Sequence, residues 1–309
     1  MKFSIVHATE YEYSEPALHS YSELRIRPRR TSWQEVLSHR TDVEPKAPLH
    51  GFTDCYGNLV EFFSIHFRHS RLTVTAHSQV QTRRRPDPTA GLEISVERAR
   101  TLLAAERAHL FDFLIPSRFV SFSPEIHELA AELLPPTALF GESLFSVGRR
   151  VHELLRYVPG STDAATPVLT ALARRQGVCQ DFAHLALAIF RSGGIPARYI
   201  SGYVEPLPPQ ALRDNPEAAA RSAATGAASH AWVEIRCPGG SWVGLDPTNL
   251  SWENEQHVQA AVGRDYGDVA PLRGIFTGAR DQRLAISVRI ERIEEEDPTS
   301  NGGLPKQSG

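Results

Sequence analysis

Cys179, in the stretch "RRQGVCQDFAHL", is a residue that could do covalent chemistry. An amphipathic helical pattern follows it, and "SGG" at 192–194 ends that pattern. The predicted buried face consists of Phe182, Leu185, Ala186 and Ile189. The start of a helix carries unpaired N–H groups and the positive end of its dipole, and both favour a thiolate nucleophile. Asp181 in the same turn opposes this effect. The alternative is an inert core thiol, because free cysteine is among the most buried residue types.

A thiol nucleophile needs a base, and the base needs a group that orients it. The stretch "ASHAWVEI" places His230 at the start of a predicted strand, and "WVGLDPTN" places Asp246 at the end of the next one. The turn "CPGG" between them predicts a strand pair that brings these two residues together. Strand alternation puts His230 and Trp232 on one face of the sheet. A lone histidine is more often structural, but the three residues together favour a Cys-His-Asp catalytic set.

Other polar residues near these stretches are weaker candidates. Tyr203 in "SGYVEP" and Asn249 in "DPTN" are expected to line the cleft. His184 follows Cys179 by five residues, about 500° around a helix, so we interpret it as a structural hydrogen-bonding residue. Cys237 has no evident base beside it and is expected to be inert, and Cys55 in the β domain is expected to be structural.

Three sequence blocks resemble the catalytic blocks of the transglutaminase-like superfamily of papain-like thiol enzymes. They are "GVCQDFAHL", "SHAWVEI" and "WVGLDPTN", in that order. The N-terminal stretches "HATEYEYSEP", "LRIRPR" and "DCYGNLVEFF" are similar to the N-terminal region of bacterial transglutaminase-like proteins. The segments that flank the catalytic blocks, including "HVQAAVGRDYGDVAPLRGIFTG", are also similar to those proteins. The resemblance covers nearly the whole chain apart from its tail.

The resemblance implies a catalytic triad of Cys179 as nucleophile, His230 as general base and acid, and Asp246 as the orienting group. It implies a thioester acyl-enzyme formed from an amide, whose acyl group passes to water or to an amine. In this superfamily an aromatic side chain or the N–H of the cysteine stabilises the oxyanion. Trp232 is a candidate for that aromatic group, with core packing as the favoured alternative. Gln180 follows the nucleophile, so it does not match the oxyanion glutamine of papain, which precedes the cysteine.

The chain has 309 residues, which favours two domains. We predict an α+β protein: an all-β, sandwich-like domain at 1–85, a linker at 86–93, a papain-like transglutaminase core at 94–293 and a disordered tail at 294–309. In the core, a helix is expected to pack on an antiparallel sheet. Further helices are predicted at 123–134, 142–158 and 167–175, and strands at 197–205, 229–237, 241–248, 257–264 and 283–293. The loop at 206–228 is expected to border the cleft, and 262–274 to be a cleft wall or a polar turn.

Composition limits the possible partners and cofactors. A formal net charge of −3 with 22% charged residues does not indicate binding to nucleic acid or to a membrane surface. Three cysteines without CxxC spacing favour neither a disulfide framework nor a structural zinc site. The first residues show no signal-like apolar run, so we expect a cytoplasmic enzyme without a cofactor, acting on a peptide or another amide. The sequence gives no oligomeric state.

Several functions are compatible with these residues. Amide or isopeptide hydrolysis is favoured over crosslinking through an amine acceptor, because no EF-hand-like run of acidic ligands is present. A zinc site built from Cys179, His230 and Asp246 is disfavoured, because their spacing matches no metal-ligand pattern. A non-catalytic binding module on the same fold is the third alternative, and the intact Cys-His-Asp set argues against it.

Overall fold

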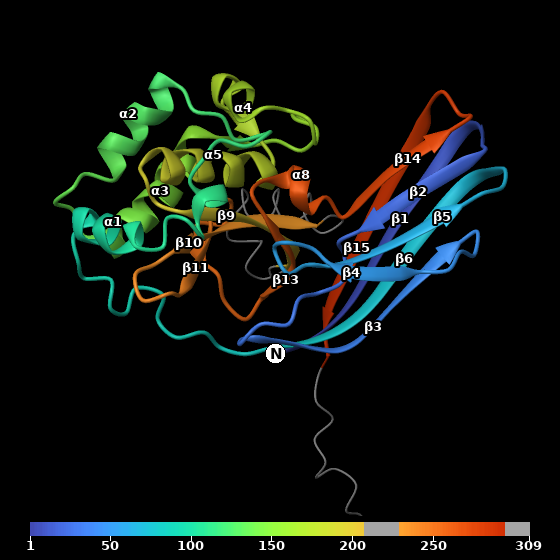
Figure 1. Ribbon diagram of the computed structural model, residues 1–309, viewed down its shortest axis with the longest axis horizontal. Coiled ribbons are helices and arrows are strands. Elements are labelled where there is room, and N and C mark those ends of the chain that lie inside the picture. Colours follow the sequence, from blue (N-terminus) through green and yellow to red (C-terminus); the bar gives the residue numbers. More distant parts are fainter. Residues whose placement is uncertain (207–228, 294–309) are drawn as a thin grey trace, which may run out of the picture.

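The structure is a computed structural model, which describes residues 1–206 and 229–293. Two lobes lie side by side, a β lobe and a core lobe that carries the helices (Figure 1). This is the α+β arrangement that the sequence predicts. The predicted loop at 206–228 and the predicted tail at 294–309 lie outside the described residues, except for Pro206.

The β lobe is a sandwich of two antiparallel sheets, each of which has four strands in the described part of the chain. The first sheet has the order β15-β1-β6-β3 and the second has the order β14-β2-β5-β4. Their strands are β1 (Lys2–Ala17), β2 (His19–Leu24), β3 (Gln34–Glu44), β4 (His50–Thr53), β5 (Leu59–Ile65), β6 (His69–Thr82), β14 (Leu272–Thr277) and β15 (Gln282–Arg292). Alternate residues of β6 point inward, as Leu72, Val74 and Ala76 show with at most 2% of their surface exposed. Strand alternation therefore builds this core.

Two strands of the β lobe come from the far end of the chain. β15 pairs along β1, with Phe3 opposite Arg292, and β14 pairs along β2, with Leu24 opposite Leu272. The predicted core domain, 94–293, includes both strands. Because β14 and β15 belong to the sheets of the β lobe, the core domain ends before β14. The predicted strand at 283–293 matches β15, whereas the predicted loop at 262–274 also contains α8 (Tyr266–Val269) and the start of β14. A local pattern reveals a strand but not its distant partner.

The core lobe contains an antiparallel sheet of five described strands, in the order β12-β11-β10-β9-β13. Its strands are β9 (Ala197–Val204), β10 (His230–Arg236), β11 (Trp242–Asp246), β12 (Ser251–Trp252) and β13 (His257–Gly263). The helices before it are α1 (Val96–Ala104), the 3-10 helix η1 (Phe111–Phe113), α2 (Pro124–Leu133), α3 (Phe140–Leu154), α4 (Val168–Arg174) and α5 (Cys179–Ser192). α2, α3, α4 and α5 match predicted helices, and α1 was not predicted, although Ser95 caps its first turn.

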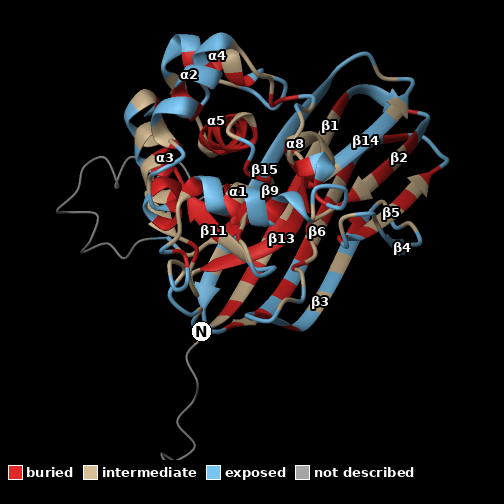
Figure 2. Ribbon diagram, turned by 60° about the vertical axis from the view of Figure 1, so that its left-hand side comes forward, coloured by how far each residue is buried: buried red, intermediate tan, exposed pale blue. Residues whose placement is uncertain are grey.

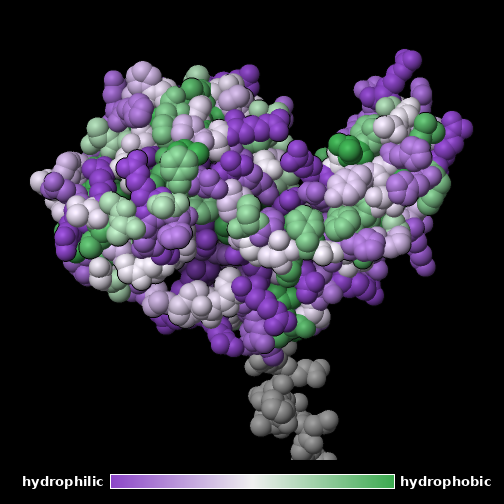
Figure 3. Space-filling view, in the orientation of Figure 1, coloured by the Kyte–Doolittle hydropathy of each residue, from purple (hydrophilic) through white to green (hydrophobic). Residues whose placement is uncertain are grey.

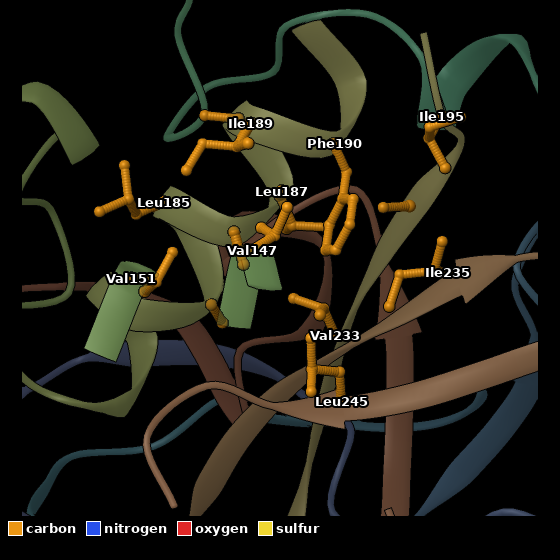
Figure 4. Close-up of a cluster of buried hydrophobic side chains, with 14 of the residues drawn as sticks. Val147, Val151, Leu185, Leu187, Ile189, Phe190, Ile195, Val233, Ile235 and Leu245 are labelled. Atoms are coloured by element: carbon orange, nitrogen blue, oxygen red, sulfur yellow. The ribbon is translucent and has the colours of Figure 1, made fainter. Parts of the chain in front are cut away.

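Helix α5 is the centre of the core lobe. Every residue from 180 to 191 is buried, so the prediction of one buried face is wrong (Figure 2). The sheet lies on one side of α5, and α2, α3 and α4 pack around the rest of it. Figure 4 shows Leu187 and Phe190 of α5 gathered in one cluster with Val147 of α3 and Val233 of β10. α5 buries Asp181, His184 and Arg191 along with its apolar residues, and this packing on every side fixes where its first residue, Cys179, lies.

The two lobes share a buried interface. Phe3 and Ile5 of β1 pack in one apolar cluster with Tyr203 of β9 and Val258 of β13. His7 Nδ1 lies 3.0 Å from the Tyr203 hydroxyl, which also donates to the Ile26 carbonyl at 3.2 Å. Burial lowers the pKa of His7 to about 4, so this imidazole is neutral near pH 7. The β lobe is therefore packed against the sheet that carries His230.

Candidate active site

Cys179 is the first residue of α5, after the N-cap residue Val178. It is half-buried, whereas Cys55 is exposed and Cys237 is buried. The first N–H groups of a helix have no partner within it, and the positive end of the helix dipole lies at the same place. Of the three thiols, the half-buried Cys179 is therefore the one at a helix start, where a thiolate and a developing oxyanion are favoured.

Asp181 and Gly177 fix the start of α5. Asp181 Oδ2 accepts hydrogen bonds from the Val178 N–H at 2.8 Å and from the Thr162 hydroxyl at 2.5 Å. A Cβ atom at Gly177 would lie 2.6 Å from the Asp181 Cβ, so only glycine fits beside this carboxyl. Burial raises the pKa of Asp181 above its usual value, although its hydrogen bonds counteract that rise. Asp181 therefore caps the start of α5, which is a structural role.

The β10–β11 hairpin brings His230 and Asp246 together, as the sequence predicts. Val233 lies opposite Leu245 in this antiparallel pair, so the start of β10 meets the end of β11. His230 Nε2 lies 2.7 Å from Asp246 Oδ2, and both side chains have at most 4% of their surface exposed. An ion pair this short and buried holds the imidazole in one orientation.

His230 also lies within hydrogen-bonding reach of the Cys179 thiol. Burial alone would lower the pKa of His230, but the Asp246 carboxylate and the hydrogen bond and charge of Cys179 raise it to about 10. Because Nε2 faces Asp246, Nδ1 is the ring nitrogen left for the thiol. The helix start and the hairpin therefore converge on one thiol–imidazole–carboxylate arrangement.

Asp246 is held by several donors. The backbone N–H groups of Thr248 and Asn249 donate to its Oδ1 at 2.9 and 3.1 Å, and Asn249 Nδ2 donates to its Oδ2 at 2.7 Å. Burial would raise the pKa of Asp246, but the imidazoles of His230 and His257 hold it well below its usual range. The carboxylate stays ionised, so it can orient an imidazolium. Asn249, expected to line the cleft, is exposed and lies at this site.

His257 is also part of the site, although the sequence pattern did not identify it as a candidate. Its Nε2 lies 3.4 Å from Asp246 Oδ2, and its Nδ1 lies 3.2 Å from Asn254 Oδ1. Burial lowers the pKa of His257, so it is a neutral partner of the carboxylate. Its place at the start of a predicted strand is the signal that could have identified it. That signal is weak, because β13 pairs with β9 rather than with β10 or β11, which carry His230 and Asp246. Only the sheet order brings His257 to Asp246.

Two candidates from the sequence are buried: Trp232 packs in the core, the alternative that the sequence favoured, whereas Tyr203 does not line the cleft as expected. Trp232 is fully buried, 6.1 Å from the His230 ring and 5.2 Å from the His257 ring, so it packs beneath the site. Gly202 makes room for it, because a Cβ there would lie 2.6 Å from the Trp232 ring. Tyr203 is 2% exposed and packs in the interface between the lobes rather than in the cleft.

Three tyrosines that the sequence did not single out for chemistry surround Cys179. Burial raises the pKa values of Tyr157, Tyr199 and Tyr266, and the nearby Cys179 sulfur raises them further. Tyr157 reaches this position because β7 (Arg156–Tyr157) pairs in parallel with β8 (Gln176–Gly177), just before α5. The three phenols are therefore neutral near pH 7.

His184 has the structural role predicted for it. Its Nε2 accepts a hydrogen bond from the Tyr266 N–H at 3.2 Å, and its ring stacks 5.7 Å from Phe119. Burial lowers the pKa of His184 to about 3, so it is neutral. It fixes the position of Tyr266 beside the site. In the described part of the chain, no group of three or more metal-binding side chains is placed to share an ion.

Comparisons with known proteins agree with this architecture. The model of the bacterial transglutaminase-like N-terminal region matches residues 3–81, and that of the transglutaminase-like superfamily matches residues 128–247. The uncharacterized protein ML0607 of Mycobacterium leprae is 34% identical over 94% of this chain and 99% of its own length. The uncharacterized protein Rv2569c of Mycobacterium tuberculosis is 33% identical over 95% of this chain and 93% of its own length. The chain belongs to the transglutaminase-like superfamily and carries the bacterial N-terminal region.

A solved structure shows the same fold. The Cytophaga hutchinsonii protein named "Putative Cysteine Protease" superposes with a TM-score of 0.75 at 23% identity, over 96% of this chain and 92% of its own. This confirms the predicted fold class, with an N-terminal β domain and a papain-like core. No helix in residues 1–206 and 229–293 has the length and apolarity needed to cross a membrane.

Proposed function

We propose that the protein is a thiol hydrolase that cleaves an amide or isopeptide bond, with Cys179, His230 and Asp246 as its triad. The observation that carries this proposal is the buried His230–Asp246 pair, 2.7 Å apart, beside a half-buried thiol at a helix start. The family and the fold are those of thiol enzymes, which supports the same chemistry.

In the proposed reaction the Cys179 sulfur attacks the amide carbonyl carbon. The His230 imidazolium donates its proton to the departing nitrogen as the C–N bond breaks, which releases an amine and leaves a thioester. His230 then takes a proton from water, the resulting hydroxide attacks the thioester, and the acid leaves as the thiol is restored. The Cys179 N–H at the start of α5 stabilises the oxyanion of both tetrahedral intermediates. Asp246 orients the imidazole throughout.

The triad is tested by measuring iodoacetamide alkylation at each cysteine as a function of pH, in the wild type and in His230→Ala. We expect Cys179 to react well below the ordinary thiol pKa of about 8.5 and to lose that reactivity in the variant. If Cys179 labels no faster than the buried Cys237 at any pH, with or without His230, the proposal is wrong.

Hydrolysis and transfer share the thioester and differ only in the acceptor. The released acid and the amine adduct of a peptide amide can be counted by mass spectrometry in the presence of a primary amine. We propose that acid is the main product; a dominant adduct would make the protein a protein-glutamine amine transferase. A cytoplasmic location stays a prediction of the sequence.

A further inference from the structure

The edge strand β15 leaves two large apolar side chains uncovered. Leu284 is 48% exposed and Ile286 is 44% exposed. Among the described strands β15 pairs with β1 alone, so the backbone N–H and C=O groups along its other edge have no strand partner. Free edges with apolar side chains are a liability that soluble proteins normally avoid, unless another chain is meant to pair there.

Leu284 and Ile286 lie on the face of β15 that points toward the core lobe. Val288, which is 8% exposed, packs with Tyr203 and Val258 of the core sheet, and it shares their face because strand side chains alternate. The β1 partner of Leu284 is Tyr11, which packs against the apolar interior of the β sandwich. The two exposed residues therefore lie between the interior of the sandwich and the contact with the core lobe.

This surface lies on the side of the β lobe that faces the core lobe, which carries the candidate active site. Helix α8, which carries Tyr266, lies between α5 and the β lobe (Figure 1). The pKa of Tyr11 is raised to about 12 by burial and by the nearby phenols of Tyr13 and Tyr266. Tyr266 in turn is close enough to Cys179 for the sulfur to raise its pKa after burial. Tyr266 thus lies near both Tyr11 and Cys179, and Figure 3 shows a hollow between the two lobes with apolar side chains on the β-lobe side.

The chemistry of this strip fits an extended peptide. Leu284 and Ile286 are two residues apart, the same period at which an extended chain presents side chains to one face. The charged neighbours on β1, Glu10 and Glu12, are both paired with Arg71. A peptide that adds to a strand edge gains main-chain hydrogen bonds along it, while side chains on alternate positions provide the selectivity.

We propose that Leu284, Ile286 and Tyr11 form a substrate subsite, which binds an extended peptide segment with apolar side chains at alternate positions. The peptide runs along the free edge of β15 and presents its amide to Cys179. This inference rests on the proposed function for the amide that is cleaved, but the binding itself needs no thiol chemistry. The β lobe then selects the substrate, and the core lobe cleaves it.

Binding is measured with the full chain carrying Cys179→Ala, so that no turnover occurs. The probe is a fluorescein-labelled octapeptide of alternating leucine and serine, compared with an all-serine octapeptide, in an anisotropy titration. We expect the leucine probe to bind more tightly and Leu284→Glu to weaken it by at least about tenfold. Ile286→Ser is a milder second substitution, which should also weaken the binding of the leucine probe. The matched control is Ile275→Glu: Ile275 is 74% exposed but lies opposite Tyr21 on the outer face of the second sheet.

The inference is wrong if Leu284→Glu and Ile286→Ser bind the leucine probe as tightly as the Ile275→Glu control, or if the two octapeptides bind equally or not at all. Failure of the proposed function gives a different result. In that case the leucine probe still binds in a Leu284-dependent way, whereas iodoacetamide labelling of Cys179 does not depend on His230. With the native cysteine present, Leu284→Glu is expected to leave this labelling unchanged.

Discussion

Replacing Asp246 by asparagine removes the charge that keeps His230 protonated. In the wild type the pKa of His230 rises from 6.5 to about 10, a difference of about 3.5 units. At about 1.4 kcal/mol per unit, the imidazolium is stabilised by about 5 kcal/mol, an upper bound to which Cys179 also contributes. With the carboxylate gone, burial is opposed only by the thiolate. We therefore expect the pKa of His230 to fall below about 6, toward the values of about 4 and about 3 that burial gives His7 and His184.

The assay is the pH dependence of iodoacetamide alkylation, mapped separately at each cysteine by mass spectrometry. Loss of the imidazolium should move the acid limb of the Cys179 profile upward by about two pH units, so that alkylation at pH 6 becomes about 100-fold slower. Two internal references are present: Cys55 is exposed, and burial raises the pKa of Cys237 to about 12. Neither profile should change.

A matched control is Glu234→Gln, a buried carboxylate on the same strand β10 that pairs with Arg198 instead of His230. It should leave the Cys179 profile in place. If the Asp246→Asn profile superimposes on that of the wild type, the carboxylate does not control the pKa of the imidazole and the reasoning fails.

The His230–Asp246 pair should also affect the pH dependence of stability. Because the pKa of His230 is raised on folding, its contribution is complete below about pH 6.5 and is lost as the pH rises through 10. The difference in Tm between wild type and variant should therefore narrow at high pH.

Three further predictions follow from the packing around the site. His257→Phe removes a weak donor from Asp246 and should slow Cys179 alkylation at pH 6 by about fivefold, much less than Asp246→Asn; an equal loss would contradict its positioning role. Gly177→Ala places a Cβ 2.6 Å from Asp181 and should lower the unfolding free energy in urea by about 1–3 kcal/mol, whereas an unchanged midpoint would show that α5 can shift. The pKa of His7 is lowered on folding to about 4, so wild-type stability should fall as the pH drops from 6.5 toward 4, by up to about 3 kcal/mol; His7→Gln should flatten that pH dependence of Tm, and equal slopes would refute it.

The sequence determined the parts of the site that depend on neighbouring residues. The apolar pattern after Cys179 fixed a helix that begins at the thiol, and the turn "CPGG" fixed the hairpin that pairs His230 with Asp246. Helix periodicity, strand alternation and turn chemistry act over a few residues, so the sequence reports them directly. Trp232 lay on the predicted face of the sheet, but its burial could not be read from that alternation.

Only the tertiary structure decided which distant elements meet. The pairing of β15 with β1 sets Phe3 opposite Arg292, and the position of β13 beside β9 brings His257 to Asp246. No local pattern encodes these contacts, because strands of similar composition can pair in many orders, and packing of the whole sheets selects one. The sequence therefore determined the proposed thiol nucleophile, its proposed base and the proposed orienting carboxylate. The fold decided what surrounds them: the second histidine, the three phenols and the apolar edge of β15.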